Sequence, residues 1–168
     1  MMIFEKINIT QIINDHIETL VNDNKKRPGL DDCITFLLLP IFISTLLLFL
    51  KVYLDVNVIN IIITALAILL GLLFNVIIIL FDIIKRDSTK KIKNNILEQL
   101  ISNISFAILL SIFAIIMVLC TFINNCFIRL VIHWYIYFIL SLFLLTVLMI
   151  LKRIYTLFKN EIKEIENN

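Results

Sequence analysis

The sequence predicts an all-α, polytopic membrane protein with four transmembrane helices, an N-terminal amphipathic helix and both termini in the cytoplasm. Three observations predict this class. Hydrophobic residues make up 61% of the 168 residues, whereas soluble domains contain roughly 45–50% apolar residues. The apolar residues gather in four runs of near-bilayer length. Lys and Arg are concentrated in alternate connections between these runs, which is the asymmetry that orients a membrane protein.

Residues 1–27 precede the first apolar run and are predicted to form a cytoplasmic amphipathic helix. Apolar residues recur there at steps of three and four, and Glu5, Asp15 and Glu18 interrupt them. This pattern excludes a signal peptide. The helix would lie in the headgroup region or dock on a partner, or else pack under the membrane helices as an ordinary cytoplasmic helix.

The first two membrane helices are predicted at about 31–50 and 57–81. Asp31 or Asp32 would cap the first, and Pro40 would kink it because proline removes a backbone donor. The connection from Lys51 to Asp55 is very short. It predicts that these two helices are antiparallel neighbours.

The last two membrane helices are predicted at about 104–123 and 129–151. Residues 82–103 are predicted to be a cytoplasmic helical extension, in which the third helix begins near Ser88 or Thr89 before it enters the membrane. Residues 152–168 are predicted to be a cytoplasmic tail. His133 lies among Trp134, Tyr135 and Tyr137 at the start of the fourth helix. Such aromatic residues prefer the membrane–water interface.

The distribution of basic residues predicts the topology. Four, five and four Lys or Arg lie in the N-terminal segment, the central connection and the C-terminal tail, and one lies in each short loop. The positive-inside rule then places both termini and the central connection in the cytoplasm.

Two predicted helices carry small and polar side chains on one side. On the second helix these residues fall within a sector of roughly 80° at 100° per residue. They are Asn57, Asn60, Thr64, Ala67, Gly71, Asn75 and Asp82. On the third helix a similar sector holds Asn103, Ala107, Ser111, Ala114, Thr121 and Asn125. The two stripes would face each other as a helix seam, or the first would line a pore between several copies.

The sequence contains no motif that indicates catalysis. G-x-x-x-x-G-K-[ST], G-x-S-x-G and H-E-x-x-H are absent, and no pair of acidic residues lies in the apolar runs. The spacing of Cys33, Cys120 and Cys126 does not suit a metal. Cys120 and Cys126 would form a disulfide only in an oxidising compartment, and free thiols are favoured. We therefore expect no enzyme and no cofactor, and the net charge of +2 is too small to predict nucleic acid as a partner.

The expected partners are membrane lipids, further copies of the chain and a cytoplasmic protein. A basic face in the central connection would bind the protein or anionic lipid, or would serve only as a topology signal. It comprises Lys85, Arg86, Lys90, Lys91 and Lys93. Two function classes remain, a membrane scaffold and an oligomeric pore.

The segment from Ile96 to Leu119, where a cytoplasmic helix enters the apolar run, resembles a family of small membrane proteins. These are multispanning proteins of bacterial anti-phage defence systems, including the four-helix membrane subunit of Kiwa-type defence and abortive-infection effectors. The resemblance implies an oligomeric inner-membrane protein that senses or perturbs the membrane together with a cytoplasmic partner. It carries over no functional residue.

Overall fold

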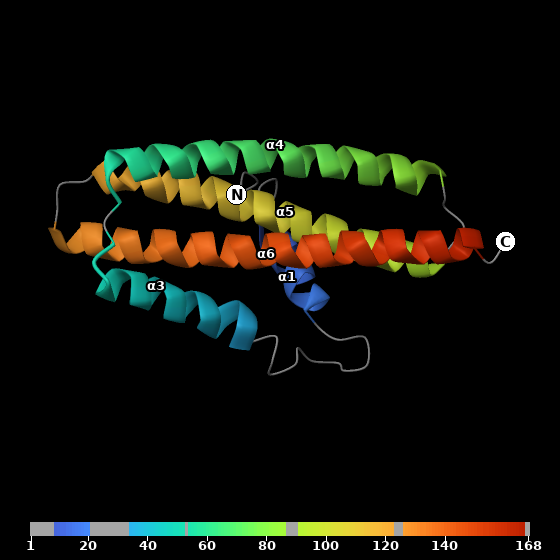
Figure 1. The fold of residues 1–168 in the computed structure, drawn as a ribbon, viewed down its shortest axis with the longest axis horizontal. Helices are drawn as coiled ribbons and strands as arrows, with labels where there is room; N and C mark the ends of the chain where they lie inside the picture. The colour runs from blue at the N-terminus through green and yellow to red at the C-terminus, as the bar shows by residue number, and fades with distance from the viewer. Residues whose placement is uncertain (1–8, 21–33, 53, 87–90, 123–125, 167–168) are drawn as a thin grey trace, which may run out of the picture.

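The computed structural model describes residues 9–20, 34–52, 54–86, 91–122 and 126–166, and every regular element among them is helical (Figure 1). The elements are α1 (Ile9–Thr19), the π-helical turn η2 (Ile34–Leu38), α3 (Leu39–Phe49), α4 (Val56–Arg86), α5 (Lys91–Leu119), the 3-10 turn η3 (Cys120–Phe122) and α6 (Cys126–Glu166). The predicted all-α class is confirmed for this part of the chain.

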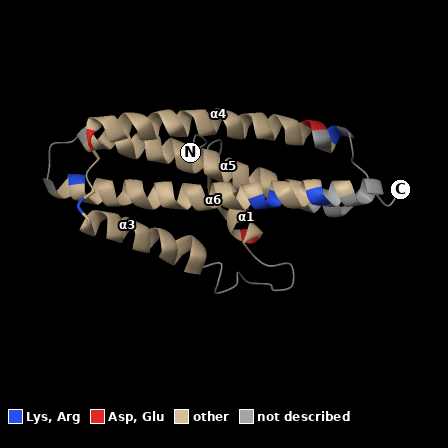
Figure 2. Ribbon diagram, in the orientation of Figure 1, with Lys and Arg blue, Asp and Glu red and all other residues tan. Residues whose placement is uncertain are grey.

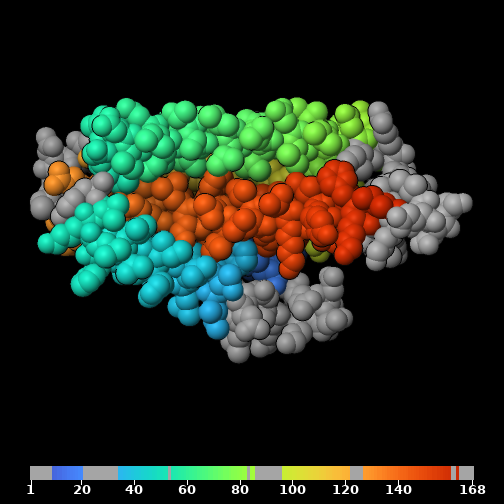
Figure 3. Space-filling model, in the orientation of Figure 1, coloured from blue at the N-terminus to red at the C-terminus, as the bar shows by residue number. Residues whose placement is uncertain are grey.

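The antiparallel helices α5 and α6 form the centre of the fold. α4 and α1 pack against α5, and α3 packs against α6 (Figure 1). On the face seen in Figure 3, α4 covers one edge, α3 covers the other, and α6 lies between them. Among the described residues, α4 therefore packs on α5 and α3 on α6, and neither contacts a further long helix.

Apolar side chains seven residues apart hold α4 to the centre. Ile59, Leu66, Leu73 and Leu80 are each 7% exposed or less. A step of seven residues returns to nearly the same side of an α-helix, so these four side chains form one continuous ridge. Three of them join the main core with α5 residues such as Leu100, whereas Ile59 joins a second cluster near the other end of the bundle.

Three helices are long and apolar enough to cross a membrane. They cover Val56–Asp82, Ile96–Leu119 and Phe127–Lys159, whereas the remaining apolar helix, Ile34–Phe49, is shorter. The predicted first span, 31–50, is not one regular α-helix in its described part. A π-helical turn ends at Leu38, and Pro40 lies in the first turn of α3, where its missing donor breaks no α-helical hydrogen bond.

The first two membrane helices run in opposite directions as predicted (Figure 1), but the prediction that they are neighbours is wrong. Among the described residues α3 and α4 make no helix–helix contact, because α3 packs on α6 and α4 packs on α5. The connection between them is fixed on α6, where the Tyr137 hydroxyl donates a 2.6 Å hydrogen bond to the Val52 carbonyl. Lys51 adopts a left-handed conformation with φ 53°. The chain turns there and carries α4 to the other side of the bundle.

Charged residues lie toward the two ends of the long helices and on α1 (Figure 2). Between Arg129 and Lys152, α6 contains no charged residue over about 34 Å at 1.5 Å per residue. This distance is close to the roughly 30 Å thickness of the hydrocarbon core of a bilayer. α6 thus has an uncharged stretch of membrane dimensions.

Candidate functional site

The polar stripe predicted on α4 lies on the surface of the chain. Asn57, Asn60, Thr64, Gly71 and Asn75 are all exposed. At 100° per residue the stripe is centred about 160° away from the ridge of Ile59, Leu66, Leu73 and Leu80. The leucine ridge, not the stripe, packs against the rest of the protein.

The carboxamides of the stripe have open hydrogen-bonding capacity. The side chains of Asn57, Asn60 and Asn75 have no hydrogen-bond partner among the described residues. The Thr64 hydroxyl is different, because it donates to the Asn60 carbonyl one turn earlier at 2.8 Å. A Cβ added at Gly71 would meet no atom within 4 Å, so the middle of the stripe is an open surface.

The polar stripe predicted on α5 lies inside the protein. Asn103, Ala107, Ser111 and Ala114 have no exposed surface, and Thr121 is half-buried. The Ser111 and Thr121 hydroxyls donate to the carbonyls of Ile108 and Val118 in the preceding turn. Small side chains with internally satisfied hydroxyls let neighbouring helices approach α5 closely.

The two stripes do not meet, which corrects the expected seam between them. The buried α5 stripe and the exposed α4 stripe lie in different environments. The physical reason is that α4 offers a continuous leucine ridge that fills space against α5, and exposed amides would not pack as densely. The α5 stripe is instead covered within the chain.

Little of the predicted basic face lies among the described side chains. Lys85 is exposed, and its ammonium group lies 4.8 Å from the centre of the Phe81 ring. The side chains of Arg86, Lys91 and Lys93, and Lys90 as a whole, lie outside the described residues. Cys120 is a free thiol, and the side chain of Cys126 also lies outside this set.

The structure adds a polar junction that joins α1, α5 and α6. His16 of α1 is 3% exposed. Its ring stacks on Phe106 of α5 with centroids 3.9 Å apart and meets Phe36 edge-on at 6.1 Å. Its Nδ1 lies 2.8 Å from the side-chain Oδ1 of Asn103. The imidazole is therefore fixed between two aromatic rings and one carboxamide.

Arg153 connects α6 to the same junction. Its guanidinium donates 2.8 Å and 2.6 Å hydrogen bonds to the Gln99 Oε1 on α5 and to the Thr19 carbonyl at the end of α1. A positive charge at the C-terminus of a helix also complements the helix dipole. Burial lowers the pKa of His16, a hydrogen bond donated by Nδ1 to Oδ1 of Asn103 would raise it, and the nearby Arg153 lowers it further.

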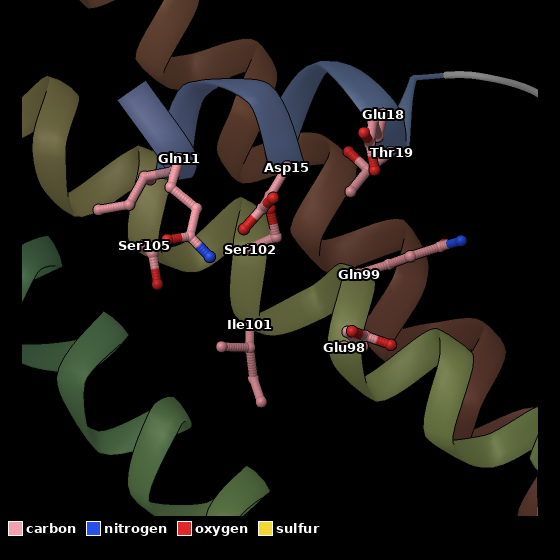
Figure 4. Close-up of a pocket in the computed structure, with 10 residues that line it drawn as sticks. Gln11, Asp15, Glu18, Thr19, Glu98, Gln99, Ile101, Ser102 and Ser105 are labelled. Carbon is pink, nitrogen blue, oxygen red and sulfur yellow. The ribbon is translucent and has the colours of Figure 1, made fainter. Parts of the chain in front are cut away.

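A cavity of about 520 Å³ opens beside the junction between α1 and α5. In Figure 4, Gln11 and Asp15 extend from α1 toward the part of α5 that carries Ser102 and Ser105. Glu18 and Glu98 also line the cavity. Three carboxylates make it more favourable for cations than for anions. Among the described residues, no three His, Cys, Asp or Glu side chains are grouped as ligands of a metal ion.

The sequence contained one signal for the polar junction. On α1, His16 occupies the same side as Ile9, Ile12 and Leu20, which follow the helical period. A histidine within an apolar stripe indicates a buried polar contact, but the pattern does not identify the partner. Asn103 lies on another helix, 87 residues away.

Comparison of the chain with family models, curated proteins and solved structures gives no match.

Proposed function

We propose that this chain is a non-enzymatic, self-associating membrane protein in which α4 forms the contact between copies. The observation that carries the proposal is the exposed α4 stripe, whose asparagine amides lack partners among the described residues. The stripe from Asn57 to Asn75 extends over about 27 Å of helix. It therefore covers most of the depth of a bilayer.

The apolar interior of the membrane would drive this association, because it offers the asparagine amides no hydrogen-bond partner. A carboxamide without a hydrogen-bond partner is unfavourable in an apolar medium by several kcal/mol. An asparagine both donates and accepts, so the same stripe on a second copy is a suitable partner. Each interhelical hydrogen bond contributes about 0.6–2 kcal/mol. α4 is also the least covered span, with 11% of its most apolar window buried, compared with 44% for α5 and 33% for α6.

The proposed arrangement has four membrane passes with both termini in the cytoplasm of a bacterial inner membrane. The short helix Ile34–Phe49 and residues before it would form the first pass. The loops at Lys51 and Arg129 would then face outward, and the ends that carry Lys85, Lys152 and Lys159 would face inward. Reactivity of single introduced cysteines toward an impermeant maleimide tests this topology, and labelling at residue 85 in intact cells would contradict it.

Self-association is tested by fluorescence energy transfer between labelled copies in liposomes. Replacing both Asn60 and Asn75 by Leu should reduce the fraction of associated copies at least tenfold, because the partners of the amides are lost. The matched control is Leu72→Ile, which changes an exposed apolar residue on the same helix. Equal association of the Asn-free variant and the wild type would refute α4 as the contact helix.

A pore is the second candidate function. The stripe is uncharged from Asn57 to Asn75 and faces away from its own chain, so a ring of α4 helices would surround a polar path. Dye leakage from liposomes, abolished by Asn75→Leu, supports the pore. Intact liposomes with preserved association support a scaffold that holds a cytoplasmic partner or anionic lipid through Lys85, Arg86, Lys90, Lys91 and Lys93.

Anti-phage defence is the proposed biological context, and it rests on the resemblance of Ile96–Leu119 to membrane proteins of such systems. In this role the assembly senses or perturbs the membrane on infection and acts with a cytoplasmic partner. Infection of cells that carry or lack the gene, scored by phage yield and survival, tests this context. Unchanged phage yield across diverse phages would remove it.

A further inference from the structure

We propose that α1 undocks from the bundle at acidic pH. His16 is the group that binds the proton, and its hydrogen bond to Asn103 holds α1 in the docked position. The proposal does not depend on self-association. It rests on the geometry of the polar junction, in which one buried imidazole contacts groups from α5 and η2 and lies near the charge of Arg153 on α6. It also rests on a count of the protons available there.

The proton count determines how Asn103 is oriented. The Thr19 hydroxyl has a single proton and lies 2.6 Å from the His16 carbonyl and 2.7 Å from the Asn103 side chain at Oδ1. Neither of these carbonyl oxygens can donate, so the single hydroxyl proton can serve only one of them, and in the other contact two oxygens would meet within 2.7 Å without a proton. In the same orientation the buried Asn103 Nδ2 has no partner.

Exchanging the carboxamide nitrogen and oxygen of Asn103 removes both conflicts. The two ends have nearly the same shape, and hydrogen bonds decide their placement. The amino group then donates one proton to the Thr19 hydroxyl and the other to Nδ1 of His16. Only the carbonyl oxygen stays unpartnered, which is more readily tolerated than an unpaired N–H. Nδ1 must accept in this arrangement, so docked His16 is neutral with its proton on Nε2.

Protonation of His16 is incompatible with this arrangement. A proton on Nδ1 would face the amino group of Asn103, and the added charge would be buried between Phe106 and Phe36. The charged group near His16 from α6 is Arg153, which repels an imidazolium. The side chains that contact the ring from α5 and η2 are neutral. The nearest carboxylates, Asp15 and Glu18 on α1 and Glu98 on α5, line the neighbouring cavity.

The direction of the pH effect follows from linkage. The pKa of His16 is lowered in the docked state, so docking is at full strength above the free imidazole pKa of about 6.5. The docking equilibrium constant falls about tenfold per pH unit below that value, until the docked-state pKa is reached. When α1 undocks, the hydrogen bond from Arg153 on α6 to the Thr19 carbonyl on α1 is broken.

The test measures the distance between spin labels in the full chain in lipid nanodiscs. The labels replace Asn14 and Lys152, which are both exposed, in a background where Cys33, Cys120 and Cys126 are changed to Ala. The expected result is one narrow distance at pH 7.5 and a broad, longer distribution at pH 5.0, with a midpoint below pH 6.5. An unchanged distribution at pH 5.0 overturns the proposal.

Two variants separate His16 from other titrating groups. Asn103→Asp places a carboxylate against the ring, so α1 should stay docked at pH 5.0 where the wild type opens. His16→Gln removes the titration, so its distribution should not change between pH 7.5 and 5.0. A wild-type-like pH response in His16→Gln overturns the proposal. Circular dichroism of each variant verifies that the bundle is folded, and the wild-type measurement decides the matter if a variant is not.

Discussion

Nδ1 of His16 lies 2.8 Å from the side chain of Asn103, although 87 residues separate them in the sequence. This contact gives α1 a defined position against α5, because a buried ring stacked on Phe106 has little freedom. α1 has 11 residues, and a helix of this length is not stable alone in water. It therefore depends on its contacts with the bundle. The amphipathic helix and the bundle are therefore one structural unit.

Replacing Asn103 by Leu should loosen α1 without unfolding the bundle. Both His16 and Thr19 lose a buried hydrogen-bond partner, which weakens docking by about 1–3 kcal/mol. Hydrogen exchange of the α1 amides at pH 7.5 measures this effect as lost protection. Asn75→Leu is the control, because Asn75 is exposed and lies on α4, which makes no contact with α1 among the described residues. Equal protection in both variants would contradict the role of Asn103.

Replacing Leu66 by Ala should lower the free energy of unfolding by about 2 kcal/mol. This is the low end of the range for buried leucines, because lipid tails are as apolar as the lost side chain and the loss is one of packing. Leu66 is 2% exposed, whereas Leu72 on the same helix is 55% exposed. Leu72→Ala should therefore change unfolding in mixed micelles by less than about 0.5 kcal/mol. A similar loss in both variants would argue against the leucine ridge.

Enlarging Ala114 to Leu should force α5 apart from its neighbours. Ala114 has no exposed surface, and adding atoms to a filled interior costs about 1–3 kcal/mol. Ala65→Leu places the same bulk on the exposed side of α4 and should be tolerated. Thermal unfolding of both variants in detergent measures the difference, and a stable Ala114→Leu protein would show that the α5 stripe is loosely covered.

Removing the Tyr137 hydroxyl should free the connection between α3 and α4. Tyr137→Phe loses the hydrogen bond to the Val52 carbonyl, which contributes about 0.5–1.5 kcal/mol. Amides near Lys51 and Val52 should exchange faster, by roughly three- to tenfold. Tyr135→Phe is the control, because Tyr135 is 45% exposed. Faster exchange of these amides in Tyr135→Phe but not in Tyr137→Phe would contradict the role of the Tyr137 hydroxyl.

The candidate sites were predicted unequally well. The α5 stripe of Asn103, Ser111 and Thr121 was recognised from helical periodicity, and it lies at least half-buried, as a seam requires. The α4 stripe was recognised by the same rule but lies outside. Periodicity reports that polar side chains share one side of a helix. It does not report whether that side turns toward its own chain or toward another.

By itself, the sequence determined the helical class, three of the four predicted helices as long enough to cross a membrane, and the positions of the stripes, because these follow from composition and from the 3.6-residue period. Only the tertiary structure decided which helices touch, that α4 packs by leucines, and that His16 meets Asn103. Those outcomes depend on how whole surfaces fit together, and side chains far apart in the sequence contribute to that fit at the same time.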